Sequence, residues 1–162
     1  MLAAPIPANE AERLAALHSL RILDTSREEA YDRLIAYAAR TSEVPIALVS
    51  LVDANRQWFK SRIGIDACET ARDISFCGHT ILQSDVFIIE DASRDERFFD
   101  NPLVTGAPHI RFYAGAPIVN EDGLALGALG QVQAAGGDLR RTLADLLGVL
   151  ADFGDDPREV DV

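Results

Sequence analysis

The stretch PIALVSLVDANRQWFKSRIGI, residues 45–65, decides the fold class of this chain. Its first part, 45–53, is short, rich in β-branched residues and apolar on both faces, as is typical of a central strand that is covered on both sides. The letters DANR that follow are a turn signal, and residues 57–65 predict a second, more polar strand. The two strands are therefore expected to form a hairpin.

The second strand of this hairpin carries an unusual set of large side chains. Strand alternation would place Trp58, Lys60 and Arg62 together on an outer face. Such a face could contact another protein, since Trp and Arg are favoured at interfaces. The stems of the two cations could equally cover the tryptophan ring in solvent.

Signals for helices and further strands flank the hairpin. A capping box formed by Ser26 and Glu29, or by Thr25 and Glu28 in a second register, predicts the start of a helix that reaches about residue 40. Periodicity and turn residues predict the remaining elements. These are helices at 9–20, 76–83 and 138–153, strands at 86–91, 111–119 and 124–133, and loops at 66–73 and 92–110.

This order of elements predicts an α+β fold. A central antiparallel sheet would have helices on one face and the looped middle segment on the other. A length of 162 residues fits one domain. We expect a flexible N-terminus at 1–8, a single domain at 9–153 and a disordered acidic tail at 154–162.

Composition narrows the classes of partner. The chain has 26 acidic and 15 basic side chains, a net charge of −11, and Lys60 is its only lysine. An acidic surface repels phosphates, so neither nucleic acid nor a membrane surface is an expected partner. No signal-peptide pattern and no apolar run near the ~20 residues that span a bilayer is present, which favours a cytoplasmic location. Cys68 and Cys77 are then expected to be free thiols.

The segment ISFCGHTI, residues 74–81, places Cys77 and His79 two positions apart. The pair suggests a metal site, a thiol nucleophile or a redox switch. In a helix the two side chains would point about 200° from each other, which argues against a shared metal. A thiolate at a helix N-terminus would have a lowered pKa, so redox sensing stays open. The simplest interpretation is that Cys77 is a small buried hydrophobe and His79 is a hydrogen-bonded partner that fixes the helix start.

The segment RFFDNPLVTGAPHIRFYAG, residues 97–115, is the strongest candidate for binding. In extended chain His109, Arg111 and Tyr113 would share one face, and irregular segments often carry function. The strand that follows is rich in Ala and Gly, so the sheet beneath would leave volume unfilled. We therefore predict a cavity for a small polar or anionic ligand. Its predicted border is Cys77, His79, Phe98, Phe99, His109, Arg111 and Tyr113. The open alternative is that Arg111 pairs with a carboxylate such as Asp73, Asp91 or Asp95.

Taken together, several stretches resemble the bacterial GAF domain of sensory and signal-transduction proteins. They are the hairpin, NEAERLAALHSLRILDT (9–25), ETARDISFCGHTIL (69–82), NPLVTGAPHIRFYAGAPI (101–118) and GLALGAL (123–129). The resemblance implies an antiparallel sheet of five or six strands, a helical layer behind it and a small-molecule pocket on the opposite side. It also implies pairing as a homodimer through the terminal helices.

The expected function is that of a cytoplasmic sensory module. It would bind an unknown small molecule and relay occupancy through its terminal helices to a separate signalling output protein. Neither catalysis, nor a metal, nor a cofactor is expected. The alternatives are a ligand-free dimerisation scaffold, a thiol-based redox sensor, or a thiol-dependent reductase, because one GAF-like group reduces free methionine sulfoxide.

Overall fold

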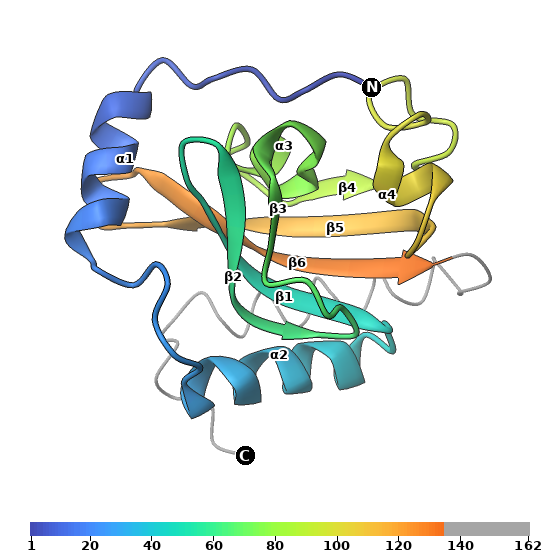
Figure 1. The fold of residues 1–162 in the computed structure, drawn as a ribbon, viewed down its shortest axis with the longest axis horizontal. Coiled ribbons are helices and arrows are strands. Elements are labelled where there is room, and N and C mark those ends of the chain that lie inside the picture. Colours follow the sequence, from blue (N-terminus) through green and yellow to red (C-terminus); the bar gives the residue numbers. More distant parts are fainter. Residues whose placement is uncertain (135–162) are drawn as a thin grey trace.

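A computed structural model describes residues 1–134 and shows one six-stranded antiparallel sheet with helices on both faces (Figure 1). The sheet order is β3-β2-β1-β6-β5-β4. The strands are β1 (Ile46–Val52), β2 (Arg56–Ile63), β3 (Glu69–Ala71), β4 (Phe87–Ile89), β5 (Ile110–Val119) and β6 (Ala125–Ala134). The helices are α1 (Glu10–Ser19), α2 (Glu29–Thr41), α3 (Phe76–Thr80) and α4 (Pro102–Thr105), with one 3-10 turn, η1 (Arg72–Ile74). The predicted α+β class is confirmed, whereas the helix predicted at 138–153 lies outside the described residues.

The predicted hairpin is the centre of the sheet. β1 pairs antiparallel with β2 on one side and with β6 on the other, and every residue of β1 is buried. A strand with neighbours on both edges and cover on both faces must be apolar throughout, which explains its sequence. The turn closes where the Asp53 amide donates to the Arg56 carbonyl at 2.8 Å.

The two faces of the sheet carry different layers. Ala47 and Val49 pack against α2, and Leu51 packs against Leu17 of α1. Ile46 and Leu48 belong to the cluster on the opposite face, which includes Phe76 and Cys77 of α3. In Figure 1, α2 lies below the sheet, and α3 and the N-terminal segment lie above it. The predicted separation of helices and looped segment is therefore present.

The outer face predicted for β2 is wrong, because the strand contains a bulge. Val49 pairs with Ser61 and Ser50 with Phe59, so Lys60 is an extra residue without a partner on β1. Trp58 is buried against Leu17 and Leu51, and Lys60 is only 1% exposed.

The predicted capping box at the start of α2 is also wrong, and Lys60 takes over its role. α2 begins at Glu29 and its N-cap residue Glu28 makes no side-chain cap. Instead the Lys60 ammonium donates to Thr25 Oγ1 and to the Ser26 carbonyl, both at 2.8 Å, and pairs with Glu28. A buried cation thus holds the connection that leads into α2.

One segment differs in detail from the sequence expectation. Part of the loop predicted at 66–73 is the short edge strand β3, which pairs with Arg56–Trp58 of β2. Residues 1–8 cross the α3 side of the sheet in Figure 1, and the Leu2 amide donates to the Arg97 carbonyl at 3.0 Å. Among residues 1–134, no helix has the length and apolar character that crossing a bilayer requires.

Candidate functional site

A small cavity lies between the sheet and the segment that runs from α3 to β5. Its volume is about 30 Å³, which is room for roughly one or two water molecules. Typical ligand pockets are of order 300–1,000 Å³. The lining residues are Ile46, Leu48, Gln57, Phe59, Ile65, Thr70, Phe76, Cys77, Leu103, Pro108, Ile110, Tyr113 and Val132.

The polar groups of the cavity are uncharged and are joined to one another. The Gln57 amide donates to Thr70 Oγ1 at 2.6 Å. Gln57 Oε1 accepts hydrogen bonds from Ser75 Oγ at 2.7 Å and from Ser50 Oγ at 3.2 Å. None of the described lining residues carries a charge, so the site is suited to a neutral molecule.

A second polar group, made by Tyr113, Thr80 and Cys77, lies deeper against α3. The hydroxyls of Tyr113 and Thr80 are 2.7 Å apart, and the Tyr113 hydroxyl donates to Cys77 Sγ at 3.3 Å. Burial raises the pKa of the Cys77 thiol and holds the pKa of Tyr113 well above its ordinary value. The thiol is therefore protonated at neutral pH, which is the opposite of an activated thiolate.

The cavity is small because aromatic rings fill the volume above the glycines. A Cβ atom on Gly115 would lie 2.2 Å from the Tyr113 hydroxyl oxygen, and one on Gly130 would lie 3.5 Å from the Tyr113 ring. The ring of Phe76 stacks on Phe98 with centroids 4.2 Å apart. The glycine-rich strands do lower the sheet surface as expected, but Tyr113 occupies that space.

Seven residues are predicted to border the cavity. Two of them, Cys77 and Tyr113, do line it. Phe98 is buried behind Phe76 rather than at the cavity. His79 Nε2 donates to the Leu2 carbonyl at 3.0 Å, and burial lowers the pKa of its imidazole. His79 thus fastens the N-terminal segment to α3.

The other three predicted residues, Phe99, His109 and Arg111, lie away from the cavity. Phe99 is 54% exposed and His109 is exposed with a φ of 60°. Arg111 donates to the carbonyls of Val104 at 3.2 Å and of Ile110 at 2.9 Å.

A shift in strand register explains why these residues do not converge. The pairing of β5 with β6 is irregular between Ile110 and Phe112. Ile110 and Tyr113 therefore both face the cavity, although they are three positions apart. The alternation that would have joined His109, Arg111 and Tyr113 on one face is broken at this point.

Sequence reasoning missed the polar residues that organise the site. Ser75 caps α3, since its Oγ accepts from the Gly78 amide at 2.9 Å. A serine directly before a short helix is a recognisable N-cap signal. Gln57 shares its strand face with Phe59, but only the structure shows that this face closes over Thr70 and Ser75.

The described residues offer neither a metal site nor a disulfide. Within residues 1–134, no group of three or more His, Cys, Asp or Glu side chains could hold a metal ion. Cys68 is exposed, Cys77 is buried and both are free thiols.

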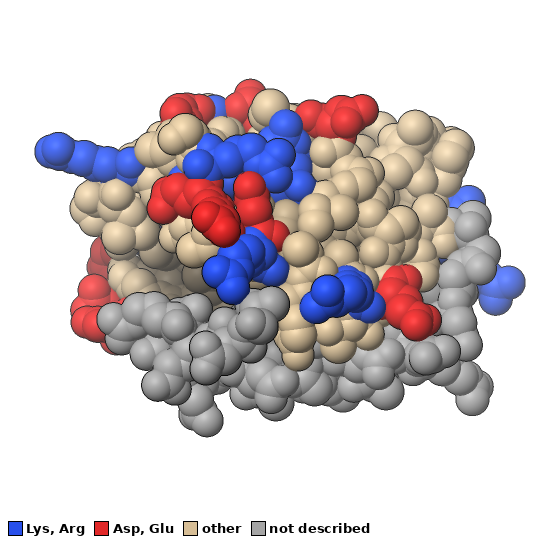
Figure 2. All heavy atoms as spheres, turned by 90° about the horizontal axis from the view of Figure 1, so that it is seen from below, with Lys and Arg blue, Asp and Glu red and all other residues tan. Residues whose placement is uncertain are grey.

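Figure 2 shows the face on the α2 side, where acidic and basic side chains lie next to each other. The described part of this face therefore has mixed charge.

Comparisons with known proteins agree with this architecture. The GAF domain family model matches residues 26–153. A cyclic di-GMP phosphodiesterase of Pseudomonas aeruginosa is 44% identical over 129 residues, which are 80% of this chain and 22% of that protein. The chain therefore spans about a fifth of the length of this curated relative.

Solved structures of low sequence identity share the fold. The GAF domain of nlh2 from A. aeolicus in an inactive state has a TM-score of 0.57 at 11% identity, covering 90% of this chain and 93% of that one. The GAF domain of a phosphoenolpyruvate-protein phosphotransferase from Coxiella burnetii has a TM-score of 0.57 at 13% identity, covering 90% and 92%. NreA of Staphylococcus aureus, mutated in its nitrate binding site, has a TM-score of 0.58 at 11% identity, covering 79% and 99%. With a family model that spans most of its length and a sheet and helices shared with these structures, the chain belongs to the GAF domain family, a family of signalling modules.

Proposed function

We propose that this GAF domain is a sensory module that binds a small, uncharged molecule in the cavity between the sheet and α3. The observation that supports this most directly is the composition of the cavity, which combines apolar walls with the neutral amide of Gln57 and the hydroxyl of Thr70. An ion would lose its hydration there and gain no opposite charge among the lining residues. This proposal replaces the polar or anionic ligand expected around Arg111.

Binding of anything larger than water requires the cavity to widen. Leu103 and Pro108 form its border on the side of α4, in a segment that carries no sheet pairing. Movement of this border, or of segment 70–77, whose pairing with β2 ends at Ala71, is cheaper than movement of β1 or β6, because few backbone hydrogen bonds of the ladder have to break.

The proposed output is the turnover of a signalling molecule by another domain or another polypeptide. The relative from Pseudomonas aeruginosa is named as a cyclic di-GMP phosphodiesterase, and the matching region is a small part of it. In this proposal the GAF domain performs no catalysis itself and acts on the output partner through its terminal helices, in the cytoplasm.

A specific observation favours a second candidate, a ligand-free scaffold. Tyr113 and the stacked rings of Phe76 and Phe98 already fill most of the space that a ligand would need. In that case the fold would serve dimerisation alone.

A thermal-shift screen separates these candidates. Small neutral amides, alcohols and nucleobases are compared with charged compounds such as nitrate and cyclic di-GMP. A neutral ligand at a hundredfold excess over its Kd should stabilise the fold by about 2.7 kcal/mol, and the charged compounds should give no shift.

Matched variants locate the binding site. Leu103→Trp fills the border of the cavity and should abolish the shift. Leu20→Trp, at the C-cap residue of α1, which is 57% exposed, should leave the shift intact. A shift that survives Leu103→Trp would place the ligand elsewhere. The scaffold is supported if no neutral compound shifts the wild type and Leu103→Trp itself raises the melting temperature.

A further inference from the structure

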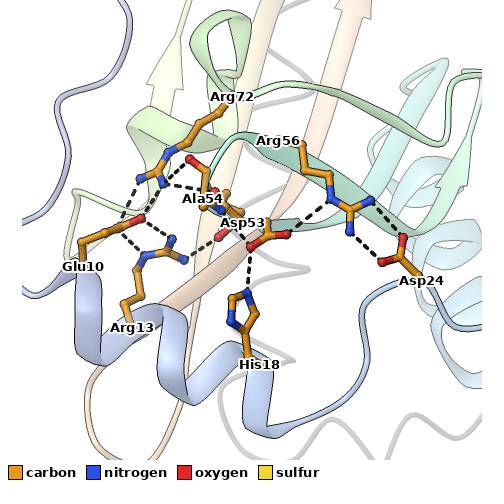
Figure 3. Close-up of polar contacts among 9 residues, drawn as sticks. Glu10, Arg13, His18, Asp24, Asp53, Ala54, Arg56 and Arg72 are labelled. Carbon is orange, nitrogen blue, oxygen red and sulfur yellow. Dashed lines mark hydrogen bonds and ion pairs between the residues drawn. The ribbon is translucent and has the colours of Figure 1, made fainter.

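An ionic clamp, made by Glu10, Arg13 and Arg72, fastens the start of α1 to the rest of the domain (Figure 3). The Glu10 carboxylate lies between two guanidinium groups. Its Oε2 accepts from Arg13 Nε and its Oε1 from Arg13 Nη2, both at 2.9 Å. Arg72 Nη1 donates to Oε1 at 2.5 Å. Arg72 comes from η1, 62 residues along the chain, so the clamp joins distant segments.

Both arginines are also tied to the end of β1 and the turn after it. Arg13 Nη1 donates to the Val52 carbonyl at 2.6 Å. Arg72 Nη1 donates to the carbonyls of Asp53 at 3.1 Å and Ala54 at 3.3 Å. The side chains of Arg13 and Arg72 are 1% and 6% exposed, so each depends on these partners for its hydrogen bonds.

Glu10 is the residue of the clamp on which both arginines depend. Burial alone would raise the pKa of its carboxyl, but hydrogen bonds from Arg13 and Arg72 outweigh burial and lower that pKa to about 2. The carboxylate is therefore charged at neutral pH. Its loss would leave two neighbouring guanidinium groups buried without a counter-charge, which is strongly unfavourable.

The segment that carries Arg72 also forms a wall of the cavity. Thr70 lies two residues before Arg72 and lines the cavity, and Phe76 and Cys77 line it on the other side of η1. Between them, the Ser75 amide donates to the Arg72 carbonyl at 3.0 Å, and Ser75 Oγ donates to Gln57 Oε1 at 2.7 Å. One segment, 70–77, thus belongs to both the cavity wall and the clamp.

We propose that the clamp connects the cavity to α1, so that displacement of segment 70–77 by a bound molecule moves Arg72 away from Glu10 and loosens α1. This inference rests on the proposed sensory function. It names the route by which binding in the cavity affects α1. A small movement suffices, because a hydrogen bond is lost when its donor and acceptor separate by roughly 0.5–1 Å beyond contact. α1 would then be freed as a unit for a signalling contact.

Hydrogen exchange of α1 tests this route without any ligand. Thr70→Ile enlarges the wall of the cavity within segment 70–77, and the α1 amides should then exchange about tenfold faster while those of β1 and β6 stay within twofold. Leu103→Phe is the matched control, since it enlarges a lining residue outside the segment. It should leave α1 exchange unchanged. Should Thr70→Ile not fold, Thr70→Val, which replaces the hydroxyl that accepts from Gln57 with a methyl group, is measured in its place.

A double-mutant cycle with the clamp completes the test. Glu10→Gln should itself accelerate α1 exchange, and adding Thr70→Ile should then produce no further increase, because the connection is already broken. Glu10→Asp, whose shorter side chain does not span both guanidinium groups, replaces Glu10→Gln if that variant does not fold. Glu12→Gln, at an exposed residue of the same helix, is the charge control and should change nothing.

Two results would overturn the proposal. One is an equal acceleration of α1 exchange by Thr70→Ile and Leu103→Phe, which would indicate a general loss of stability. The other is strict additivity of Thr70→Ile with Glu10→Gln. Either result leaves the ligand screen unaffected, and a failed ligand screen leaves the exchange result standing, so the two proposals fail separately.

Discussion

At the scale of single residues, Tyr113 determines how much room the domain offers. Its ring lies over Gly115 and its hydroxyl reaches Thr80 and Cys77. The side chain is held on three sides, so it is a fixed part of the cavity floor. Gly115 is therefore required to make room for the ring rather than to bend the chain.

The first prediction concerns these glycines. Gly115→Ala should lower the free energy of unfolding by about 1–3 kcal/mol, because the new methyl group would lie 2.2 Å from the Tyr113 hydroxyl and 2.7 Å from Thr80 Oγ1. Gly130→Ala is the control and should cost less, because its Cβ meets the movable tip of Leu48 at 3.0 Å. Urea unfolding measures both. Equal costs for the two variants would contradict the assignment of Tyr113 as the fixed group.

The second prediction concerns thiol chemistry. Because burial raises the pKa of the Cys77 thiol and the residue is 2% exposed, alkylation of native Cys77 at neutral pH should be slower than that of a free model thiol. Cys68 is exposed and serves as the internal control within the same sample. Mass spectrometry after timed iodoacetamide treatment resolves the two sites. Faster labelling of Cys77 than of Cys68 would revive the redox-sensor interpretation.

At the scale of elements, buried cations fix both N-terminal helices. Lys60, at the bulge of β2, holds the residues before α2. Arg13 and Arg72 hold α1 to the end of β1 and its turn. Neither helix has a side-chain hydrogen bond at its N-cap, so their positions depend on contacts with the sheet rather than on local capping.

The third prediction is the pH dependence of the α1 attachment. The pKa of Glu10 is lowered from 4.5 to about 2. A carboxyl with a lowered folded-state pKa contributes stability above its unfolded pKa and loses that contribution as pH falls through the folded value. The stability difference between wild type and Glu10→Gln should therefore be constant above about pH 5 and shrink between pH 4.5 and about 2.

Urea unfolding of both proteins across this pH range measures that difference. Glu12→Gln supplies the comparison, because Glu12 is exposed on the same helix. A difference between wild type and Glu10→Gln that stays constant down to pH 2 would show that the carboxylate charge does not stabilise the clamp.

At the scale of the whole molecule, the sheet separates the cavity from helices α1 and α2. Its α3 face contains the cavity, and its other face carries α1 and α2. The clamp reaches from one side to the other through the turn of the β1–β2 hairpin (Figure 3). In the proposed mechanism, a signal that begins at the cavity therefore reaches α1 through segment 70–77 without rearrangement of the β1–β6 pairing.

The fourth prediction is a homodimer built on the helix at 9–20 and the segment 138–153. The sequence of the second segment carries a leucine stripe of helical period, Leu139, Leu143, Leu146, Leu147 and Leu150, which is wider than one sheet face needs. Sedimentation at tens of micromolar should give twice the mass of the chain. The double variant Leu143→Glu, Leu150→Glu should be monomeric, whereas Leu2→Glu, at a residue that is 59% exposed, should stay dimeric. A monomeric wild type would contradict the prediction.

The sequence by itself determined the elements whose signals are local. The continuous apolar run of β1, the DANR turn and the NEDG turn between β5 and β6 predict the two hairpins, because strand alternation and turn chemistry involve only neighbouring residues. The order of these elements was then enough to predict an antiparallel sheet with its layers.

Only the tertiary structure decided which side chains meet at the cavity and at the clamp. Two irregularities of register, at Lys60 in β2 and between Ile110 and Phe112 in β5, move side chains to faces that simple alternation does not predict. A bulge depends on pairing with a strand that is distant in sequence, and so does the contact between Glu10 and Arg72. For this reason Lys60 became a buried anchor, Arg111 was turned away from the cavity, and Gln57 was brought into it.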